Sequence, residues 1–316
     1  MSTSHGARAI VAALGANLGI AVAKLVAFLV TGSSAMLAES IHSVADSGNQ
    51  VLLLVGGRRA RRAATPAHPF GYGRERYVYG FLVSIVLFTL GGLFAVYEGW
   101  HKLAEATSAG GHPGLTSPGW AVAVLAIAIV LESLSLRTAV AEATPLRGQA
   151  SWWQFVRRAK APELPVVLLE DFGALVGLLL ALVGVGLSIL TGSGVWDAAG
   201  TLAIGTLLLL IAVLLGVETK SLLLGEGASP ADLDQITEAL RAEPGVAGII
   251  HMRTLHLGPD ELLVAAKIAV DGGASAAQVA AAIDGAERRI RAAVPIARVI
   301  YLEPDLLRAA EVGEAG

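Results

Sequence analysis

The sequence predicts an all-α domain of six membrane-spanning helices followed by a small α+β cytoplasmic domain. Of its 316 residues, 54% are hydrophobic and only 16% are charged, which is too little charge to cover the surface of an ordinary soluble protein. The apolar residues are also concentrated before about residue 225, and sequence of ordinary mixed composition follows. We therefore expect a transmembrane domain at residues 1–225 and a C-terminal domain, with a disordered end, at residues 226–316.

Six apolar segments are long enough to cross a bilayer, because a spanning helix needs about 20 mostly apolar residues. They cover residues 8–31, 34–56, 76–104, 118–143, 163–190 and 196–224, and turns or polar linkers such as residues 144–162 separate them. The second-to-third and fourth-to-fifth loops carry nearly all of the loop Lys and Arg residues. Because basic loops remain in the cytoplasm, we expect a multi-pass protein of the plasma (inner) membrane with both termini cytoplasmic.

The C-terminal segment has the pattern of a small ferredoxin-like unit. An amphipathic helix is expected over residues 230–243, with acidic residues in its first turn. Two strands should follow at 246–257 and 261–270, joined at Gly258-Pro259, and then a helix at 275–293 and a strand at 297–302. This α-β-β-α-β order predicts helices packed on one face of a sheet.

His42 and Asp46 lie four residues apart within the second apolar segment. On an α-helix this spacing places both side chains on one face, and imidazole and carboxylate together suit a borderline divalent ion such as Zn²⁺. A lone histidine is more often a hydrogen-bonded core residue, but an aspartate one turn away inside a bilayer favours a functional site. The pair predicts half of an intramembrane metal site.

The fifth apolar segment can supply the other half through Glu170 and Asp171. Adjacent helix positions point about 100° apart, so Asp171 is the expected ligand and Glu170 reaches in on its longer side chain. The alternative is that both acids merely begin a helix near the interface, although they follow several apolar residues of the segment. Asn49 and Gln50 could orient the ligands or form hydrogen bonds between helices.

Other features exclude several classes of protein. There are no cysteines, so disulfides and thiolate metal sites are excluded. We find no Walker loop and no H-E-x-x-H helix of an intramembrane metalloprotease, and we expect no enzyme. Further charges within the apolar segments are expected to form structural pairs inside the bundle: Lys24, Glu39, Glu98, Glu132 and Arg137.

These motifs together resemble the cation diffusion facilitators, a family of metal/proton antiporters. The resemblance rests on His42-Ser-Val-Ala-Asp46, on the acidic pair, and on the run from His68 to Tyr77, which is similar to the family's His-Pro-Phe-Gly-His-Gly-Lys. Pro-Gly-Val at residues 244–246 is similar to the family's cytoplasmic domain. Leu-Glu-Asp at residues 169–171, Ser-Gly-Asn-Gln at 47–50 and Glu-Ser-Leu-Ser-Leu at 132–136 resemble the zinc-transporter-9-like branch.

The resemblance implies proton-coupled efflux of a divalent cation, with Zn²⁺ preferred, through alternating access at His42, Asp46, Asp171 and Glu170. Val167 stands where much of the family has His or Asp, so the fourth ligand is either Glu170 or water. His68 matches one ligand of a loop site found in some members. In the tail Ile250, Ala266 and Tyr301 replace histidines of zinc-binding relatives, so we expect no binuclear metal site there.

The expected partners are the transported metal ion, protons, the lipid bilayer and a second copy of the chain. No nucleic acid is expected, and no cofactor is expected apart from the transported ion. The alternative is a membrane metal sensor or scaffold that binds ions without transporting them.

Overall fold

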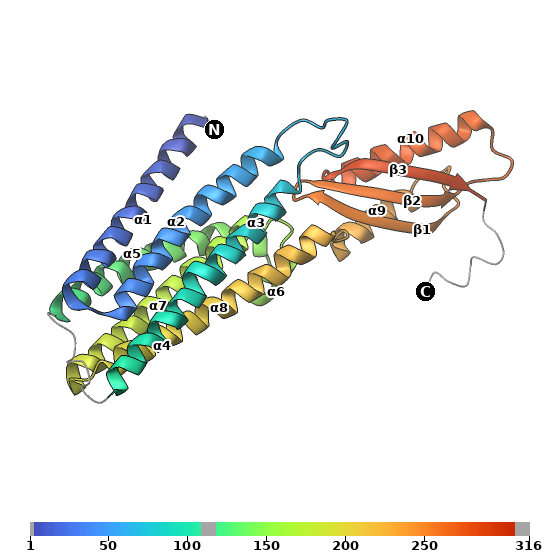
Figure 1. Cartoon of the computed structure of the whole chain (residues 1–316). Helices are drawn as coiled ribbons and strands as arrows, with labels where there is room; N and C mark the ends of the chain where they lie inside the picture. Colours follow the sequence, from blue (N-terminus) through green and yellow to red (C-terminus); the bar gives the residue numbers. More distant parts are fainter. Residues whose placement is uncertain (1–2, 109–117, 307–316) are drawn as a thin grey trace. The chain divides into compact units, whose positions relative to one another are not determined.

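The computed structural model describes residues 3–108 and 118–306, with side chains from residue 17 onward and, after the gap, from residue 119 (Figure 1). The chain divides into two compact units. One combines the residues up to Gly57 with Val78–Lys220, and the other combines Arg58–Tyr77 with the residues from Ser221. The basic loop after the second predicted span therefore belongs to the same unit as the C-terminal segment.

The first unit is helical, and its helices follow the predicted segments closely. The bounds are α1 Thr3–Thr31, α2 Ser34–Ala60, α3 Glu75–Val86, the π-helix η1 Leu87–Leu93, α4 Phe94–Thr107, α5 Pro118–Arg147, α6 Trp152–Arg158, α7 Glu163–Thr191 and α8 Val195–Leu224. Within the described residues, four continuous helices are long and apolar enough to cross a membrane: Glu75–Thr107, Gly119–Arg147, Glu163–Thr191 and Val195–Leu224. Four of the six predicted spans are thereby confirmed. Within the described side chains of α1, the apolar stretch is the shorter Asn17–Thr31. α2 carries the polar residues of the candidate site.

Two local features differ from the prediction. The linker expected over residues 144–162 is partly helical, because α5 continues through Pro145 to Arg147 and α6 follows. Ser151 and Gln154 form a capping box at the start of α6, and the S-x-x-Q spacing before an apolar stretch is its sequence signal. The third predicted span is interrupted by η1 at Leu87–Leu93. A π-helical segment has no comparably strong sequence signal.

Asp197 of α8 holds the start of α2. Its carboxylate is buried and accepts hydrogen bonds from Ser33 Oγ at 2.6 Å, Ser34 N at 2.7 Å and Ser34 Oγ at 2.9 Å. The first N–H groups of a helix have no partner within the helix, so this acid from another helix performs the role of an N-cap.

Replacing Asp197 with alanine should lower the free energy of unfolding by about 1–3 kcal/mol, because it leaves buried donors without acceptors. Asp197→Asn keeps one acceptor oxygen and should lose less. Equilibrium unfolding in mixed micelles would measure both, and equal losses for the two variants would contradict the capping role.

The helical run α3–η1–α4 packs against α8 with backbones in close contact. A Cβ added to Gly205 would lie 2.7 Å from Val96 N and 3.0 Å from Gly92 O, and one on Gly99 would lie 2.8 Å from Leu202 N. Small residues that allow helix backbones to approach are typical of packing within membranes.

Gly205→Ala should destabilise the protein by about 1–3 kcal/mol, because backbone atoms must move apart to admit the methyl group. Gly186→Ala is the matched control, since nothing lies within 4 Å of its added Cβ. Thermal unfolding in detergent should show a lower midpoint temperature for Gly205→Ala and an unchanged one for Gly186→Ala. An unchanged midpoint for Gly205→Ala would contradict the close packing.

The second unit has the predicted α-β-β-α-β order. Its elements are α9 Pro230–Arg241, β1 Gly248–Gly258, β2 Glu261–Ala269, α10 Ala276–Ala293 and β3 Ala297–Asp305. The sheet order is β1-β2-β3, with β1 antiparallel and β3 parallel to β2. One hydrophobic core joins both helices to alternate residues of β2. It includes Ile236 and Leu240 of α9, Ile290 of α10, and Val264 and Ile268 of β2. Both helices therefore cover the same face of the sheet, as predicted.

Candidate metal centre

His42 and Asp46 lie buried on α2, with His42 Nε2 3.4 Å from Asp46 Oδ2. Within the described residues, both ring nitrogens of His42 and Oδ1 of Asp46 lack a hydrogen-bond partner. Buried polar atoms are normally hydrogen-bonded, and those that are not require an explanation. Ring nitrogen and carboxylate oxygen are suitable ligand atoms for a divalent metal ion.

The π-helical segment borders this histidine. A Cβ built on Gly91 of η1 would lie 3.7 Å from His42 Nδ1, an ordinary contact distance. Single π-helical turns within α-helices occur frequently at functional sites. The third span thus contributes a small residue beside the imidazole, where a larger side chain would restrict access to the ring.

The two acids of α7 point to different neighbours. Glu170 is buried, and its Oε1 accepts a hydrogen bond from Asn49 Nδ2 of α2 at 2.6 Å. Asp171 is half-buried, and its Oδ2 accepts a hydrogen bond from Ser135 Oγ of α5 at 2.8 Å. This divergence follows from the angle of about 100° between adjacent helix positions. Glu170, rather than Asp171, is the acid bonded to the helix that carries His42.

The predicted ligands are therefore only partly together. The structure pairs His42 with Asp46, and it connects Glu170 to α2 through Asn49, while Gln50 is half-buried. In the part of the chain that the structure describes, no three His, Cys, Asp or Glu side chains lie close enough to hold a metal ion. The full ligand set remains a prediction. Ser135 and Gly91 are neighbours of the site that the sequence reasoning did not single out.

A second buried polar cluster joins α1 to α2. Lys24 Nζ of α1 is 3.0 Å from Glu39 Oε2 and donates a hydrogen bond to Ser43 Oγ at 2.8 Å. Lys24 and Glu39 are almost completely buried. The predicted structural pairing is confirmed for these two residues. A burial of this kind is costly unless both charges are paired and hydrogen-bonded.

His68, the candidate for a loop site, lies in an exposed turn of the second unit. Its backbone exchanges hydrogen bonds with Thr65 at 2.9 and 3.2 Å, and its ring contacts that of Tyr72 at a centroid distance of 4.6 Å and a tilt of 33°. Thr65 Oγ1 and Tyr72 Oη are themselves 3.2 Å apart. Neither a hydroxyl group nor an aromatic ring is a ligand that Zn²⁺ prefers, so this turn gives the weak loop site little support.

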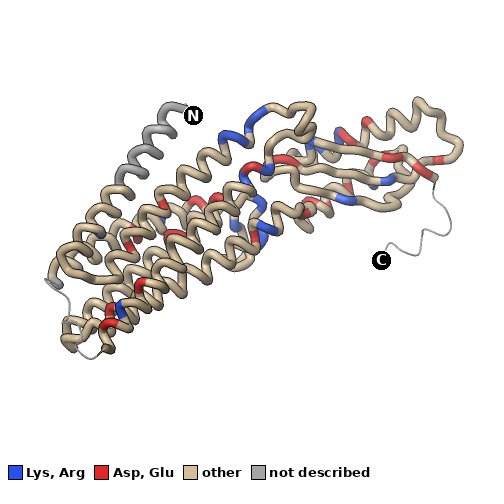
Figure 2. The backbone as a smooth tube through the Cα atoms, viewed as in Figure 1, with Lys and Arg blue, Asp and Glu red and all other residues tan. Residues whose placement is uncertain are grey.

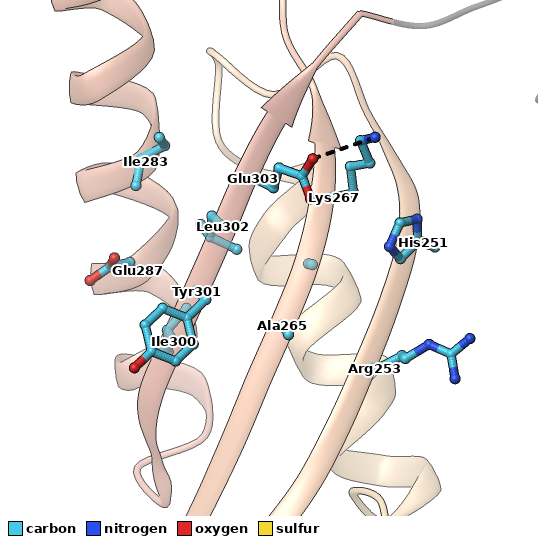
Figure 3. A pocket seen from close by; sticks show the side chains of 11 residues that line it. His251, Arg253, Ala265, Lys267, Ile283, Glu287, Ile300, Tyr301, Leu302 and Glu303 are labelled. Carbon is cyan, nitrogen blue, oxygen red and sulfur yellow. Dashed lines mark ion pairs between the residues drawn. The ribbon is translucent and has the colours of Figure 1, made fainter. Parts of the chain in front are cut away.

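The C-terminal unit carries a pocket of about 380 Å³, lined by residues of all three strands and of α10 (Figure 3). His251, Arg253, Tyr301 and Glu303 line it, together with Lys267, whose Nζ lies 2.7 Å from Asp305 Oδ2 and 3.5 Å from Glu303 Oε1. The hydrogen bond to Asp305 raises the pKa of the Lys267 ammonium group above its ordinary value. The acids at this end of β3 thus have a lysine as their partner.

Comparison with known proteins agrees with this architecture. Residues 10–224 match the cation efflux transmembrane domain, and residues 228–305 match the cation efflux protein cytoplasmic domain. The human protein "Proton-coupled zinc antiporter SLC30A9, mitochondrial" is 32% identical over 255 residues, which cover 79% of this chain and 43% of that protein. The magnetosome protein MamM of Magnetospirillum gryphiswaldense is 25% identical over 233 residues, covering 73% of this chain and 67% of MamM.

A solved structure of the MamM CTD is 20% identical with a TM-score of 0.24, and the match covers 25% of this chain and 100% of that one. The chain spans less than half the length of the curated zinc antiporters that it matches. The match to the transmembrane family nevertheless covers most of the present sequence, and the match to the cytoplasmic domain covers most of the residues that follow. The chain is therefore a multi-pass membrane protein of the cation efflux, or cation diffusion facilitator, family.

Proposed function

We propose that this protein exports Zn²⁺ in exchange for protons, through an intramembrane site formed by His42 and Asp46 of α2 and Asp171 of α7, with Glu170 or water as the fourth ligand. The observation that carries the proposal is the buried pair on α2, whose two ring nitrogens and one carboxylate oxygen have no hydrogen-bond partner among the described residues. The human zinc antiporter's similarity supports zinc as the substrate.

Coupling follows from the chemistry of these ligands. A metal ion binds neutral imidazole and ionised carboxylate, so metal ions and protons compete for the same atoms. A site that opens to one side at a time can therefore load metal from the cytoplasm and exchange it for protons on the other side. This scheme requires no nucleotide.

The hydrogen bonds of α7 suggest how the ligand set is completed. In the present arrangement Glu170 is held by Asn49 and Asp171 by Ser135. We propose that an arriving ion replaces one of these hydrogen bonds and draws the corresponding carboxylate towards His42 and Asp46. Asn49 and Ser135 then hold the acids of α7 in the metal-free state, and the fourth ligand is Glu170 or water.

The remaining features complete the proposal. We propose six spans, with α1 and α2 added to the four apolar helices, both termini in the cytoplasm, and a location in the plasma (inner) membrane. Figure 2 shows Lys and Arg gathered where α5 ends and α6 follows, in agreement with a cytoplasmic basic end. Residues 1–225 form the transport domain, and residues 226–316 support a homodimer, as the cytoplasmic family domain suggests.

Proton release on metal binding tests the proposal directly. Zn²⁺ added to the purified protein in weakly buffered detergent should release protons, which a pH-indicator dye detects. Asp46→Ala should lose this release, while Glu98→Gln, which changes an acid of another span, should retain it. Binding of Zn²⁺ without proton release would contradict antiport and favour the sensor or scaffold function.

A further inference from the structure

Beyond transport itself, the helical unit contains an apolar groove with a basic rim. Its volume is about 380 Å³, and four helices line it: α5 with Val140, α6 with Trp152, Trp153 and Val156, α7 with Leu168, Leu169 and Phe172, and α8 with Leu214. Phe172 and both tryptophans are substantially exposed. We propose that this groove binds one acyl chain of an anionic phospholipid, whose phosphate lies against the arginines of α6 and the end of α5.

The position of the groove suits a lipid because it lies within the membrane domain at its basic end. Tryptophan is enriched where a membrane protein meets the headgroup region, and α6 carries Trp152 and Trp153 followed by Arg157 and Arg158. Each tryptophan is already beside a guanidinium group, since Arg147 lies 4.6 Å from the Trp152 ring centroid and Arg157 lies 5.8 Å from that of Trp153.

The rim supplies the charge that distinguishes an anionic headgroup from a neutral one. Arg157 is paired with Glu218 of α8 at 2.9 Å, which fixes α6 as one wall of the groove. Arg158 is exposed and has no carboxylate partner within the described part of the chain. Basic pockets between transmembrane helices on the cytoplasmic side are typical sites for anionic lipid headgroups. Arg158 and Arg147 are therefore the expected phosphate contacts.

The groove also touches the turn of α7 that carries the candidate ligands. Leu169 and Phe172 line the groove and flank Glu170 and Asp171 in the sequence. An acyl chain seated there packs against the same helical turn that must move a carboxylate towards the metal. We therefore expect anionic lipid to influence transport as well as to bind.

Tryptophan quenching by brominated lipids tests the binding step independently of transport. The full chain with Trp100, Trp120 and Trp196 changed to Phe retains fluorescence only from Trp152 and Trp153. In phosphatidylcholine liposomes, brominated phosphatidylglycerol should quench it with an apparent affinity about 25-fold above that of brominated phosphatidylcholine, since each of the two arginines contributes about fivefold near an anionic headgroup.

Arg158→Gln should lower this ratio about fivefold, whereas Arg61→Gln, which changes an exposed arginine outside the groove, should leave the ratio unchanged. Val156→Phe partly fills the groove and should weaken quenching by both lipids. Equal quenching by the two lipids, with no effect of Arg158→Gln, would overturn the proposal. Quenching by both lipids that Val156→Phe leaves unchanged would overturn the acyl-chain site.

Discussion

Replacing Asp46 with alanine is expected to reduce proton-driven Zn²⁺ flux about 100-fold or more, because the variant loses a charged ligand that pairs with the metal. Asp46 lies one helical turn from His42, with its Oδ2 3.4 Å from His42 Nε2. Radioactive zinc uptake into proteoliposomes, normalised to the amount of reconstituted protein, measures the effect. Flux within a few-fold of the unmodified protein would show that Asp46 is no ligand.

The variants at Glu170 and Asp171 extend this experiment. Glu170 is hydrogen-bonded to the ligand-carrying helix through Asn49, whereas Asp171 contacts Ser135 of α5. If Glu170 is the fourth ligand, Glu170→Ala should impair flux as severely as Asp171→Ala does. If water completes the site, Glu170→Ala should retain most of the flux. Glu98→Gln, in a different span, serves as the control for loss of an acid.

The second large effect is expected at Lys24. Lys24→Met should lower the free energy of unfolding by about 3 kcal/mol or more, because it leaves the buried Glu39 carboxylate without its charged partner. The pair is 3.0 Å apart and almost completely enclosed. Unfolding in mixed micelles, followed by circular dichroism, provides the measurement.

The double variant Lys24→Met/Glu39→Gln distinguishes a broken pair from a general packing defect. Removing both charges removes the uncompensated carboxylate, so the double variant should recover much of the stability lost in Lys24→Met. A double variant that is less stable than the single one would contradict the account of this pair.

Much of the fold could be predicted from the sequence because its signals are local and strong. Runs of about 20 apolar residues set the spans, and the amphipathic pattern with its turn residues set the C-terminal elements within a few residues. The start of α9 at Pro230 and the turn at Gly258 are examples. The motif His42-Ser-Val-Ala-Asp46 likewise carries its own geometry, since an i, i+4 spacing on a helix leaves little freedom.

The features that could not be predicted depend on contacts between distant segments. Nothing local in the sequence shows that Asp197 caps α2 across more than 160 residues, or that Lys24 rather than another cation pairs with Glu39. The spacing of Glu170 and Asp171 predicted that the two acids diverge. Their partners depend on which residues of α2 and α5 lie opposite, and the sequence does not specify this.

The most direct test of the central claim is Zn²⁺ flux into proteoliposomes under an imposed pH gradient of either sign. The account predicts that Zn²⁺ moves in the direction opposite to the downhill flow of protons. This Zn²⁺ flux should reverse when the pH gradient is reversed, and it should be lost in Asp46→Ala. Zinc flux that is the same at both signs of the gradient would contradict proton antiport. No flux, despite binding of Zn²⁺ to the same preparation, would contradict transport itself.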